Sequence, residues 1–424
     1  MKPKEHYLSN ENKSFCILPW IHSNIHTTGE VRLCCIDQKI KGLGSIDKDT
    51  TWADVWNNDL YKQVRLDMLA GKPVENCTMC YKDEAVHGNS YRTTSNQGFG
   101  KVYFDSVVTK TAEDGSTPMD IRLLDIRWSN ICNLKCRMCD PTFSSLIATE
   151  LKRTTGQSGL QLTGLSGDTT YVAVTDKRPE FLKEIIPYLT NLEGIYFAGG
   201  EPMVTPEHYE MLELLIANKL THVALSYNTN LTRLSFKKWN VLDLWEHFDP
   251  NKISLRPSLD SWGTRAEYLR TGTVWSEVEE NITTLMRSNR KVINHLRPTV
   301  TITAWNVLTY TDFLDYMIDR FNFTPEEFGV DPNILSQPFQ MSLRTLPPAQ
   351  IRIALDKIAD FCQRRPEYIH LTGPSQTVVN SLEDVRYDTR IDIARPFIDN
   401  YDKIRDTSFP DTFPELKNWY NGQK

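Results

Sequence analysis

The chain has 424 residues, of which 40% are hydrophobic and 24% are charged, and its formal net charge is −6. These values are typical of a globular protein of two or three domains, and they show no basic excess that would indicate nucleic-acid binding. The sequence contains no run of 18 apolar residues and no apolar segment at its start. We therefore expect no membrane span, no secretory signal and a cytoplasmic location.

The nine cysteines are unevenly distributed along the chain. Eight of them fall into two groups, one between residues 16 and 80 and one between residues 132 and 139, whereas Cys362 stands alone. In a chain without an export signal, such groups are more typical of metal sites than of disulfides. Cys362 lies in a predicted amphipathic helix, and we expect it to be a buried core thiol.

Residues 1–115 form the first predicted unit. A strand over 21–26, a turn at Gly29 and a strand over 31–33 predict a hairpin that returns Cys34 towards Cys16. Apolar residues at three- and four-residue steps predict a helix over 52–69.

Two more cysteines follow this helix at a C-x2-C spacing. Together with the hairpin they form a four-cysteine set: Cys16, Cys34, Cys77 and Cys80. Cys35 is adjacent to Cys34 and is an equally suitable ligand on sequence alone. A tetrahedral zinc site that only stabilises a small domain is an alternative interpretation of this set.

The second group of cysteines lies in a short loop. A linker over 101–119 and a strand over 121–128 lead to Cys132, Cys136 and Cys139, at a C-x3-C-x2-C spacing. Three thiolates in one loop can hold three irons of a [4Fe–4S] cluster and leave the fourth iron open to another ligand. A structural zinc site needs four ligands, and this loop supplies three.

Alternating strands and helices follow the loop. Helices are expected over 146–152, 179–189, 207–219, 275–287 and 311–321, and strands over 194–198, 222–227, 252–255, 297–304 and 340–346. Residues 154–176, between the first two of these helices, are expected to be an irregular insertion. About six strand-then-helix units predict an α/β fold, a partial (β/α)6 TIM-like barrel over 116–350. Further helices over 351–361 and 382–401 predict a C-terminal helical extension over 351–424.

Candidate ligand residues follow several of the predicted strands, where a barrel places its chemistry. They are Gly199, Gly200, Glu201 and Pro202 after the strand over 194–198, Asn230 after the strand over 222–227, and Ser258, Asp260 and Arg270 after the strand over 252–255. Carbonyl and carboxylate oxygens suit an ammonium group, and arginine suits a carboxylate.

The cysteine loop resembles the signature of the radical S-adenosylmethionine (radical SAM) superfamily. The resemblance implies a [4Fe–4S] cluster on Cys132, Cys136 and Cys139, with S-adenosylmethionine (SAM) on the open iron. It also implies that the G-G-E-P segment binds the SAM amino group, that Ser258 and Arg270 bind the SAM carboxylate, and that Asn230 lies near SAM. Met138 replaces the usual aromatic residue against the adenine, and Asp260 is expected either to bind substrate or to cap the next helix.

The segment from Cys16 to Cys80 resembles the auxiliary-cluster modules of the same superfamily, the SPASM and shorter twitch domains. The resemblance implies one auxiliary iron–sulfur cluster on the four-cysteine set. No further cysteines follow Cys80 closely, so twitch is the better description. In many members this module follows the barrel, whereas here it precedes it.

Together these resemblances imply an enzyme that cleaves SAM reductively to a 5′-deoxyadenosyl radical for hydrogen abstraction. A flavodoxin or ferredoxin would supply the electron, and the expected substrate is a peptide or protein. The alternatives are a small-molecule substrate, a SAM-dependent transferase, an activase of a glycyl-radical partner, and a zinc-bound interaction protein without catalytic activity.

Overall fold

The computed structural model of the chain describes residues 3–9, 12–37, 42–163, 169–288, 296–384 and 390–422. It divides into two compact units. The first comprises Met1–Cys132, Pro141–Ser226 and Trp239–Lys252, and the second comprises Asn133–Asp140, Tyr227–Lys238 and Ile253–Lys424. None of the described helices is long and apolar enough to cross a membrane.

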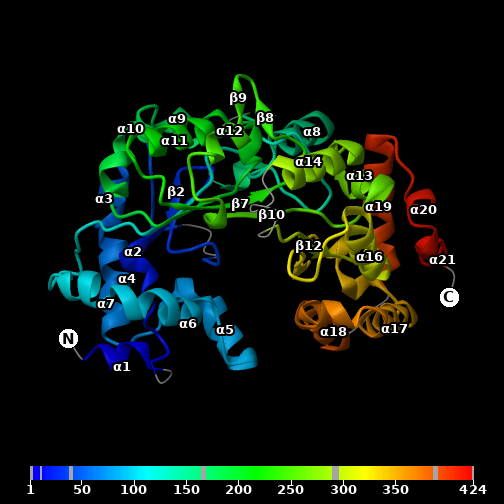
Figure 1. Cartoon of the computed structure of the whole chain (residues 1–424), viewed down its shortest axis with the longest axis horizontal. Helices are drawn as coiled ribbons and strands as arrows, with labels where there is room; N and C mark the ends of the chain where they lie inside the picture. Colours follow the sequence, from blue (N-terminus) through cyan, green and yellow to red (C-terminus); the bar gives the residue numbers. More distant parts are fainter. Residues whose placement is uncertain are drawn as a thin grey trace. The chain divides into compact units, whose positions relative to one another are not determined.

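The first unit is built on a mixed sheet (Figure 1). Its strands are β1 (His22–Ile25), β2 (Glu30–Arg32), β3 (Gly44–Ser45), β4 (Leu123–Ile126), β6 (Gly194–Phe197) and the start of β7 (Ala224–Thr229). The strand order is β7-β6-β4-β1-β2-β3. β4 pairs in parallel with both β1 and β6, and the β1–β2 and β2–β3 pairs are antiparallel. The predicted hairpin therefore belongs to the same sheet as the strand that leads to the cysteine loop.

This pairing explains why the two units differ from the three segments expected from sequence, 1–115, 116–350 and 351–424. Strand β1 comes from the cysteine-rich segment, yet its partner on one side is β4, about 100 residues later in the chain. The cysteine-rich segment and the start of the barrel thus share one sheet and one compact unit.

The two faces of this sheet differ in polarity. Side chains alternate between the faces of a strand, and registered neighbours in parallel strands share a face. One face is mainly apolar and carries Ile25, Leu124, Ile126, Ile195 and Phe197, together with Ser23, all of which are buried. The opposite face is more polar and carries His22, Asn24, Asp125, Arg127 and Tyr196, together with Leu123 and Gly194.

The helices of the first unit surround this sheet. They are α1 (Lys4–Leu8), α2 (Leu18–Ile21), α3 (Trp52–Trp56), α4 (Asp59–Leu69), α5 (Thr78–His87), α6 (Tyr91–Ser95), α7 (Lys101–Val107), α8 (Ser145–Thr155), α9 (Val174–Lys177), α10 (Phe181–Ile185), α11 (Pro206–Ala217) and α12 (Val241–Trp245). The helix expected over 52–69 is two helices, because the Asn58 side chain accepts a hydrogen bond from Tyr61 N–H and caps a new helix there.

The second unit begins its strands where β7 continues beyond Ser226. β10 (Ile253–Pro257) follows β7 in the sheet order. Isolated parallel bridges then join Leu255 to Leu296 and Ser258 to Thr299. β12 (Thr299–Ile302) pairs in parallel with β13 (Asp331–Ile334). The smaller strands are β5 (Lys135–Cys136), β8 (Ser235–Phe236) and β11 (Arg270–Thr271) in this unit, and β9 (Trp239–Asn240) in the first.

The strand expected over 340–346 is wrong. This segment forms two 3-10 turns, Phe339–Met341 and Leu343–Thr345, and the sixth parallel strand is β13 instead. The side chain of Ser342 caps the second turn by accepting a hydrogen bond from Arg344 N–H, which competes with an extended backbone. The sequence analysis missed β13 because this strand contains Pro332, and proline is typical only of edge strands.

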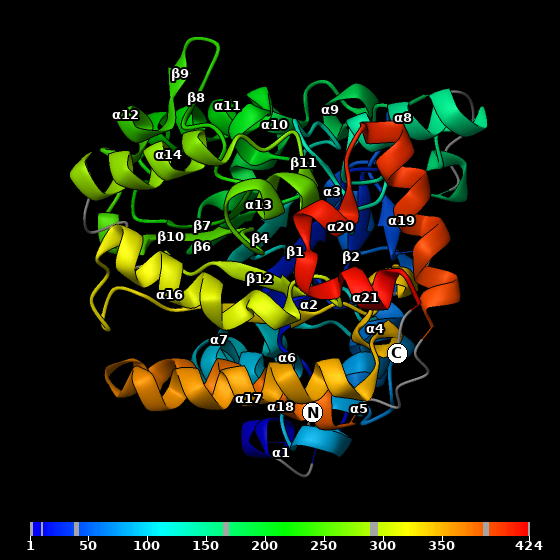
Figure 2. The same ribbon diagram turned by 90° about the vertical axis from the view of Figure 1, so that its right-hand side faces the viewer.

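The helices of the second unit are α13 (Gly263–Leu269), α14 (Trp275–Ser288), α16 (Tyr310–Phe321), α17 (Pro348–Arg364), α18 (Thr372–Asp384), α19 (Ile391–Arg405), α20 (Phe409–Thr412) and α21 (Lys417–Tyr420). α17 packs against α16 and α18, and α19 packs against α21 (Figure 2). Strands β4, β6, β7, β10, β12 and β13 are each followed by a helix. The predicted α/β fold, a partial barrel with a helical C-terminal part, is therefore confirmed.

Candidate functional site

The four-cysteine set lies together in the first unit. Cys16 precedes α2, Cys34 follows β2, and Cys77 and Cys80 lie at the start of α5. All four side chains line one small pocket, which Leu18, Leu33 and Met68 also line. Cys35 is exposed and does not line this pocket, so the structure separates the two neighbours that the sequence leaves equivalent.

Burial affects the protonation of three of these thiols, Cys16, Cys34 and Cys77. Desolvation raises the pKa of Cys16 to about 12 and also raises the pKa values of Cys34 and Cys77. A raised pKa favours the neutral thiol over the thiolate. A coordinated thiol is deprotonated outright, so a bound metal would stabilise the thiolate form in these surroundings. Within the described residues, no three His, Cys, Asp or Glu side chains are arranged to hold a single metal ion. The soft, four-sulfur donor set fits an iron–sulfur cluster.

A buried ion pair borders the same pocket and was not anticipated from the sequence. Arg92 lines the pocket, and its guanidinium donates to both carboxylate oxygens of Glu84, at 2.6 and 2.9 Å. Arg92 also donates to the carbonyl of Phe15, beside Cys16, at 2.7 Å. Burial acts to raise the pKa of Glu84, but Arg92 outweighs it and holds the pKa below its usual value. The pair ties α5 to the chain just before the first cysteine.

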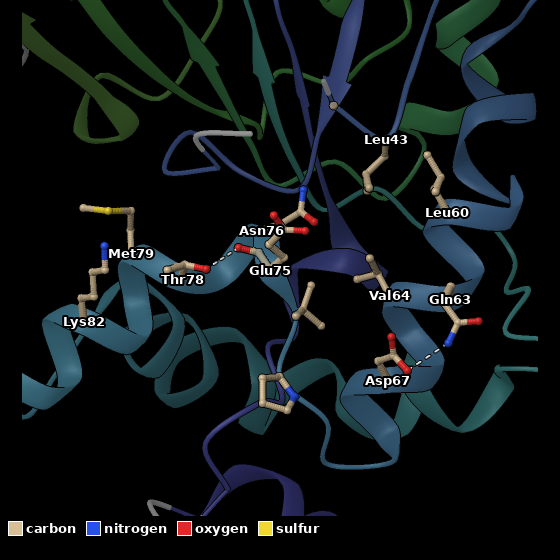
Figure 3. Close-up of a pocket in the computed structure, with 13 residues that line it drawn as sticks. Leu43, Leu60, Gln63, Val64, Asp67, Glu75, Asn76, Thr78, Met79 and Lys82 are labelled. Carbon is tan, nitrogen blue, oxygen red and sulfur yellow. Dashed lines mark hydrogen bonds between the residues drawn. The ribbon is translucent and has the colours of Figure 1, made fainter. Parts of the chain in front are cut away.

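A larger pocket, of about 890 Å³, is lined by residues on both sides of Cys77 in the chain, including Asn76 and Thr78. Figure 3 shows Leu60, Gln63, Val64 and Asp67 of α4 on one wall and Thr78, Met79 and Lys82 of α5 on the other. The four α4 residues recur at three- and four-residue steps and so share one face of the helix. Nothing in the sequence pattern distinguished this face from an ordinary solvated one.

The first part of the cysteine loop belongs to the first unit. It follows β4 and ends at Cys132. Asn130 is fully buried, and its side chain donates to the carbonyls of Pro141 and Thr170 at 2.9 and 3.1 Å. Its backbone carbonyl accepts from Ser145 N–H, at the start of α8. One asparagine therefore joins the entry and the exit of the loop. The sequence analysis did not anticipate this role, and the only signal was the position of Asn130 before the cysteines.

The Gly199–Glu201 segment packs against the backbone of this loop. Gly200 N–H donates to Ser129 O, and Glu201 N–H donates to Ile131 O at 2.7 Å. Gly199 has a φ of +114°, and a Cβ on Gly200 would lie 2.0 Å from the carbonyl oxygen of Ile131. Both positions therefore require glycine. This explains the glycine pair independently of any cofactor.

Glu201 is 2% exposed, and its carboxylate accepts a hydrogen bond from Met203 N–H at 3.0 Å. It thereby caps the 3-10 turn that begins at Pro202. The expected role of Glu201 as a ligand of an ammonium group would coexist with this cap, since a carboxylate has about four lone-pair sites.

The second part of the loop belongs to the second unit. β5 pairs antiparallel with β11, which places Cys136 opposite Arg270. Arg137 is 1% exposed; its guanidinium donates to Tyr268 O at 2.9 Å and to the Thr407 hydroxyl at 2.8 Å, and lies 3.7 Å from the centre of the Tyr268 ring. Arg405, at the end of α19, donates to Lys135 O at 2.8 Å. The end of α19 and the segment after it therefore hold the loop. The sequence analysis did not anticipate this role, and a charged residue between two cysteines was the only signal.

Three of the predicted site residues, Cys136, Asp260 and Arg270, are linked by hydrogen bonds. Arg270 donates to both oxygens of Asp260, at 2.8 and 3.1 Å, and to Cys136 Sγ at 3.5 Å. Burial acts to lower the pKa of Arg270, but Asp260 and Cys136 outweigh it and raise the pKa. Burial raises the pKa of Cys136, and the Arg270 guanidinium opposes this. Asp260 thus holds an arginine. It does not cap α13, whose amino-terminal end has no side-chain cap, whereas its expected role in substrate binding stays a prediction.

The remaining predicted residues of the second unit lie nearby in sequence and structure. Asn230 donates from its side chain to Asn133 Oδ1 of the cysteine loop at 2.8 Å. Ser258 N–H donates to Thr229 O, and the Ser258 side chain is half-buried, as is that of Met138. Leu231, which follows Asn230, adopts a φ of +55°. Within the second unit, Asn230 and Arg270 are therefore hydrogen-bonded directly to the loop, and Asp260 is linked to the loop through Arg270.

Comparisons with known proteins agree with these sites. Residues 16–81 match the SPASM model, an iron–sulfur cluster-binding domain, and residues 126–317 match the model of the radical SAM superfamily. A search of curated proteins found no match. The solved structures that resemble the chain include anSMEcpe with bound AdoMet, which is 20% identical with a TM-score of 0.39, the match covering 58% of this chain and 59% of that one.

Two further structures show comparable likeness. SuiB of Streptococcus suis is 14% identical with a TM-score of 0.34, the match covering 72% of this chain and 62% of that one. TYW1 with a bound lysine–pyruvate adduct is 14% identical with a TM-score of 0.28, the match covering 58% and 72%. This chain thus spans about three fifths of the anSMEcpe and SuiB chains.

The two family models cover both cysteine groups, in the order expected from sequence. The three-cysteine loop lies in the radical SAM match, and the four-cysteine set lies in the SPASM match. A radical SAM domain carries a [4Fe–4S] cluster and uses SAM, and a SPASM domain carries auxiliary iron–sulfur, so these are the cofactors of the chain. The chain therefore contains a radical SAM domain over residues 126–317, preceded by an iron–sulfur cluster-binding domain of the SPASM type over residues 16–81.

Proposed function

We propose that the chain uses the cluster of the three-cysteine loop to cleave SAM and abstract a hydrogen atom from a peptide or protein. A bound cluster would supply the one electron needed for cleavage of SAM to methionine and a 5′-deoxyadenosyl radical. Cys132, Cys136 and Cys139 would hold this cluster. The observation that carries the proposal is the unequal number of thiols, three in the loop and four in the amino-terminal set. Three thiolates would leave one iron of the loop cluster open for SAM.

The residues around the loop would place SAM. Gly199, Gly200, Glu201 and Pro202 would receive its amino group, Ser258 and Arg270 its carboxylate, and Met138 and Asn230 would lie near the nucleoside. The backbone of the glycine segment is held on the loop by hydrogen bonds to Ser129 and Ile131. That arrangement supports the assignment, since donors and acceptors fixed before binding cost no ordering on binding.

The auxiliary cluster would be held by Cys16, Cys34, Cys77 and Cys80, with Cys35 left as a free thiol. It would take an electron from the substrate radical or anchor the substrate. A ferredoxin or flavodoxin would supply the electron for SAM, and the reducing cytoplasm suits both clusters.

A peptide substrate is supported by the polar face of the sheet in the first unit. Asp125 and Arg127 form an ion pair on this face, with two contacts of 3.4 Å that leave hydrogen-bonding capacity on both groups. Asn24 lies beside Asp125, is 1% exposed, and its carboxamide has no partner among the described residues. Closed barrels fill the equivalent positions with apolar side chains. Donors and acceptors here instead match the alternating polar groups of a peptide backbone.

Anaerobic reconstitution tests this proposal. We expect about eight irons if both clusters are cubanes, and formation of 5′-deoxyadenosine with dithionite and SAM. Replacing Cys132, Cys136 and Cys139 together by Ala should remove about four irons and all SAM cleavage while retaining the auxiliary cluster. Cys362→Ala, outside both groups, is the matched control and should change neither value. Stoichiometric zinc without any deoxyadenosine would contradict the proposal.

The substrate class is tested separately. The reconstituted enzyme would be incubated with SAM, dithionite and size-separated fractions of a deuterated cell extract. Deuterium in 5′-deoxyadenosine after incubation with the peptide or protein fractions supports the proposal. Deuterium transferred only from the small-molecule fraction would instead identify a small-molecule substrate.

A further inference from the structure

Arg270 donates a hydrogen bond from outside the three-cysteine loop to one of the sulfurs of that loop. Its Nη1 lies 3.5 Å from Cys136 Sγ, within hydrogen-bonding range for sulfur. The contact follows from the backbone, because Arg270 in β11 is the registered partner of Cys136 in β5. Arg137 N–H donates to Leu269 O and extends the same pairing by one residue.

The guanidinium is held in place from its other side. Asp260 accepts from Nε and Nη2 of Arg270 in the two-point geometry that fixes both position and orientation. Asp260 has no exposed side-chain surface, and its own Oδ1 also accepts from Thr301 N–H at 2.8 Å. The Asp260 backbone carbonyl accepts from the Asn306 side chain at 3.0 Å. The donor that faces Cys136 is therefore fixed by residues of β12 and of the segment that follows it.

The two hydrogen bonds to Asp260 restrict the orientation of the Arg270 guanidinium. Of its five N–H groups, two are taken by Asp260 and one faces Cys136 Sγ. A residue that served only to bind the carboxylate of SAM would not need a contact with the thiol of a cluster ligand.

We propose that Arg270 is a positioning residue that raises the reduction potential of the cluster on Cys132, Cys136 and Cys139 by donating an N–H···S hydrogen bond to Cys136. The inference rests on the proposed function, which places the cluster on these three cysteines. Reduction adds one electron to the cluster, supplied by dithionite in the test below. It increases the negative charge on the ligand sulfurs, so a cationic donor at the sulfur stabilises the reduced state more than the oxidised one.

The test measures the midpoint potential of the loop cluster in the reconstituted full chain without SAM. The signal is electron paramagnetic resonance during a dithionite titration, in variants that also carry Cys16→Ala and Cys77→Ala to remove the auxiliary cluster. Arg270→Gln should lower the ratio of reduced to oxidised cluster about tenfold at a fixed potential, which is 59 mV for one electron. Arg270→Lys keeps the charge but loses the two-point hold, and it should give an intermediate value.

Arg265→Gln is the matched control. Arg265 lies in the neighbouring helix α13 and donates to Glu415 at 2.9 Å. It should leave the midpoint potential unchanged, which shows that loss of an arginine in this region does not shift the potential by itself.

Two results would overturn the inference. One is a midpoint potential of Arg270→Gln equal to that of the parent without SAM, combined with weakened SAM binding, since Arg270 would then act only on SAM. The other is loss of the loop cluster in both Arg270 variants, which would show a role in assembly instead of tuning. Failure of the parent protein to form 5′-deoxyadenosine from SAM would instead contradict the proposed function, so the two failures are distinguishable.

Discussion

Arg137, between the second and third cysteines of the loop, lies 3.4 Å from the carboxylate of Asp402 in α19, 265 residues later in the chain. The same carboxylate accepts from the hydroxyls of Tyr268 and Thr407 and from Phe409 N–H, each at 2.7 Å. The half-buried Asp402 carboxylate therefore connects α13, the loop and the C-terminal helices of the second unit.

The first prediction concerns this carboxylate. Asp402→Ala leaves the Arg137 guanidinium buried without its counter-ion, and we expect a loss of about 3–5 kcal/mol in the free energy of unfolding, because an uncompensated buried charge is costly. The reconstituted variant should also hold less iron. Chemical denaturation and iron analysis measure both quantities. Asp399→Ala is the control on the same helix, since Asp399 is exposed and bonds only to the Tyr420 hydroxyl; an equal loss in both variants would contradict the prediction.

The second prediction separates the neighbouring cysteines 34 and 35. Cys34 lines the pocket with three other cysteines, whereas Cys35 is exposed outside it. Cys34→Ala should lower the iron content of the reconstituted protein by about four atoms if the auxiliary cluster is a cubane. Cys35→Ala should retain the full iron content and the visible absorption of the cluster. The reverse outcome would make Cys35 the ligand.

The third prediction concerns Gly200. A methyl group there would lie 2.0 Å from Ile131 O, just before Cys132, so the loop backbone must move. We expect Gly200→Ala to cost about 1–3 kcal/mol or more in stability and to abolish cluster binding by the loop. Iron content and thermal unfolding measure the two effects. Gly98→Ala is the matched control, since a Cβ at Gly98 meets nothing within 4 Å; similar behaviour of the two variants would refute the steric explanation.

The fourth prediction is a pH dependence that arises from His26. Burial, followed by the nearby charges of Arg32 and Arg127, lowers the pKa of His26 from 6.5 to about 3. The unfolded chain therefore binds a proton between these values that the folded chain does not, so stability falls as pH falls below about 6.5. The slope due to one such histidine is at most about 1.4 kcal/mol per pH unit.

His26→Gln should reduce this slope in denaturation experiments between pH 6.5 and pH 4. Part of the slope should persist, because burial also lowers the pKa of His22, the first residue of β1, which ends just before His26. His247→Gln, at an exposed position, serves as the control. An unchanged slope in His26→Gln would show that His26 is already charged in the folded protein.

Much of the fold was predictable because its elements have strong local signals. α11, α14 and α16 lie within two residues of the predicted helices, since apolar residues recur on one face of each. β6, β7 and β10 were likewise expected from short apolar runs. The strand predicted over 340–346 was wrong because a serine cap and neighbouring prolines favour turns, which a two-residue alternation does not reveal.

Thiol spacing and turn residues are local properties of the chain. Local patterns therefore sufficed to find the two cysteine groups and the glycine pair and to identify both domains. The partners that these residues contact, in contrast, depend on the tertiary structure. It placed β1 of the cysteine-rich segment beside β4, selected Cys34 over Cys35 for the pocket, and brought Asp402 to Arg137. It also placed Arg270 between Asp260 and Cys136. Such contacts join residues far apart in the chain, and their geometry depends on the packing of whole elements, which no local pattern encodes.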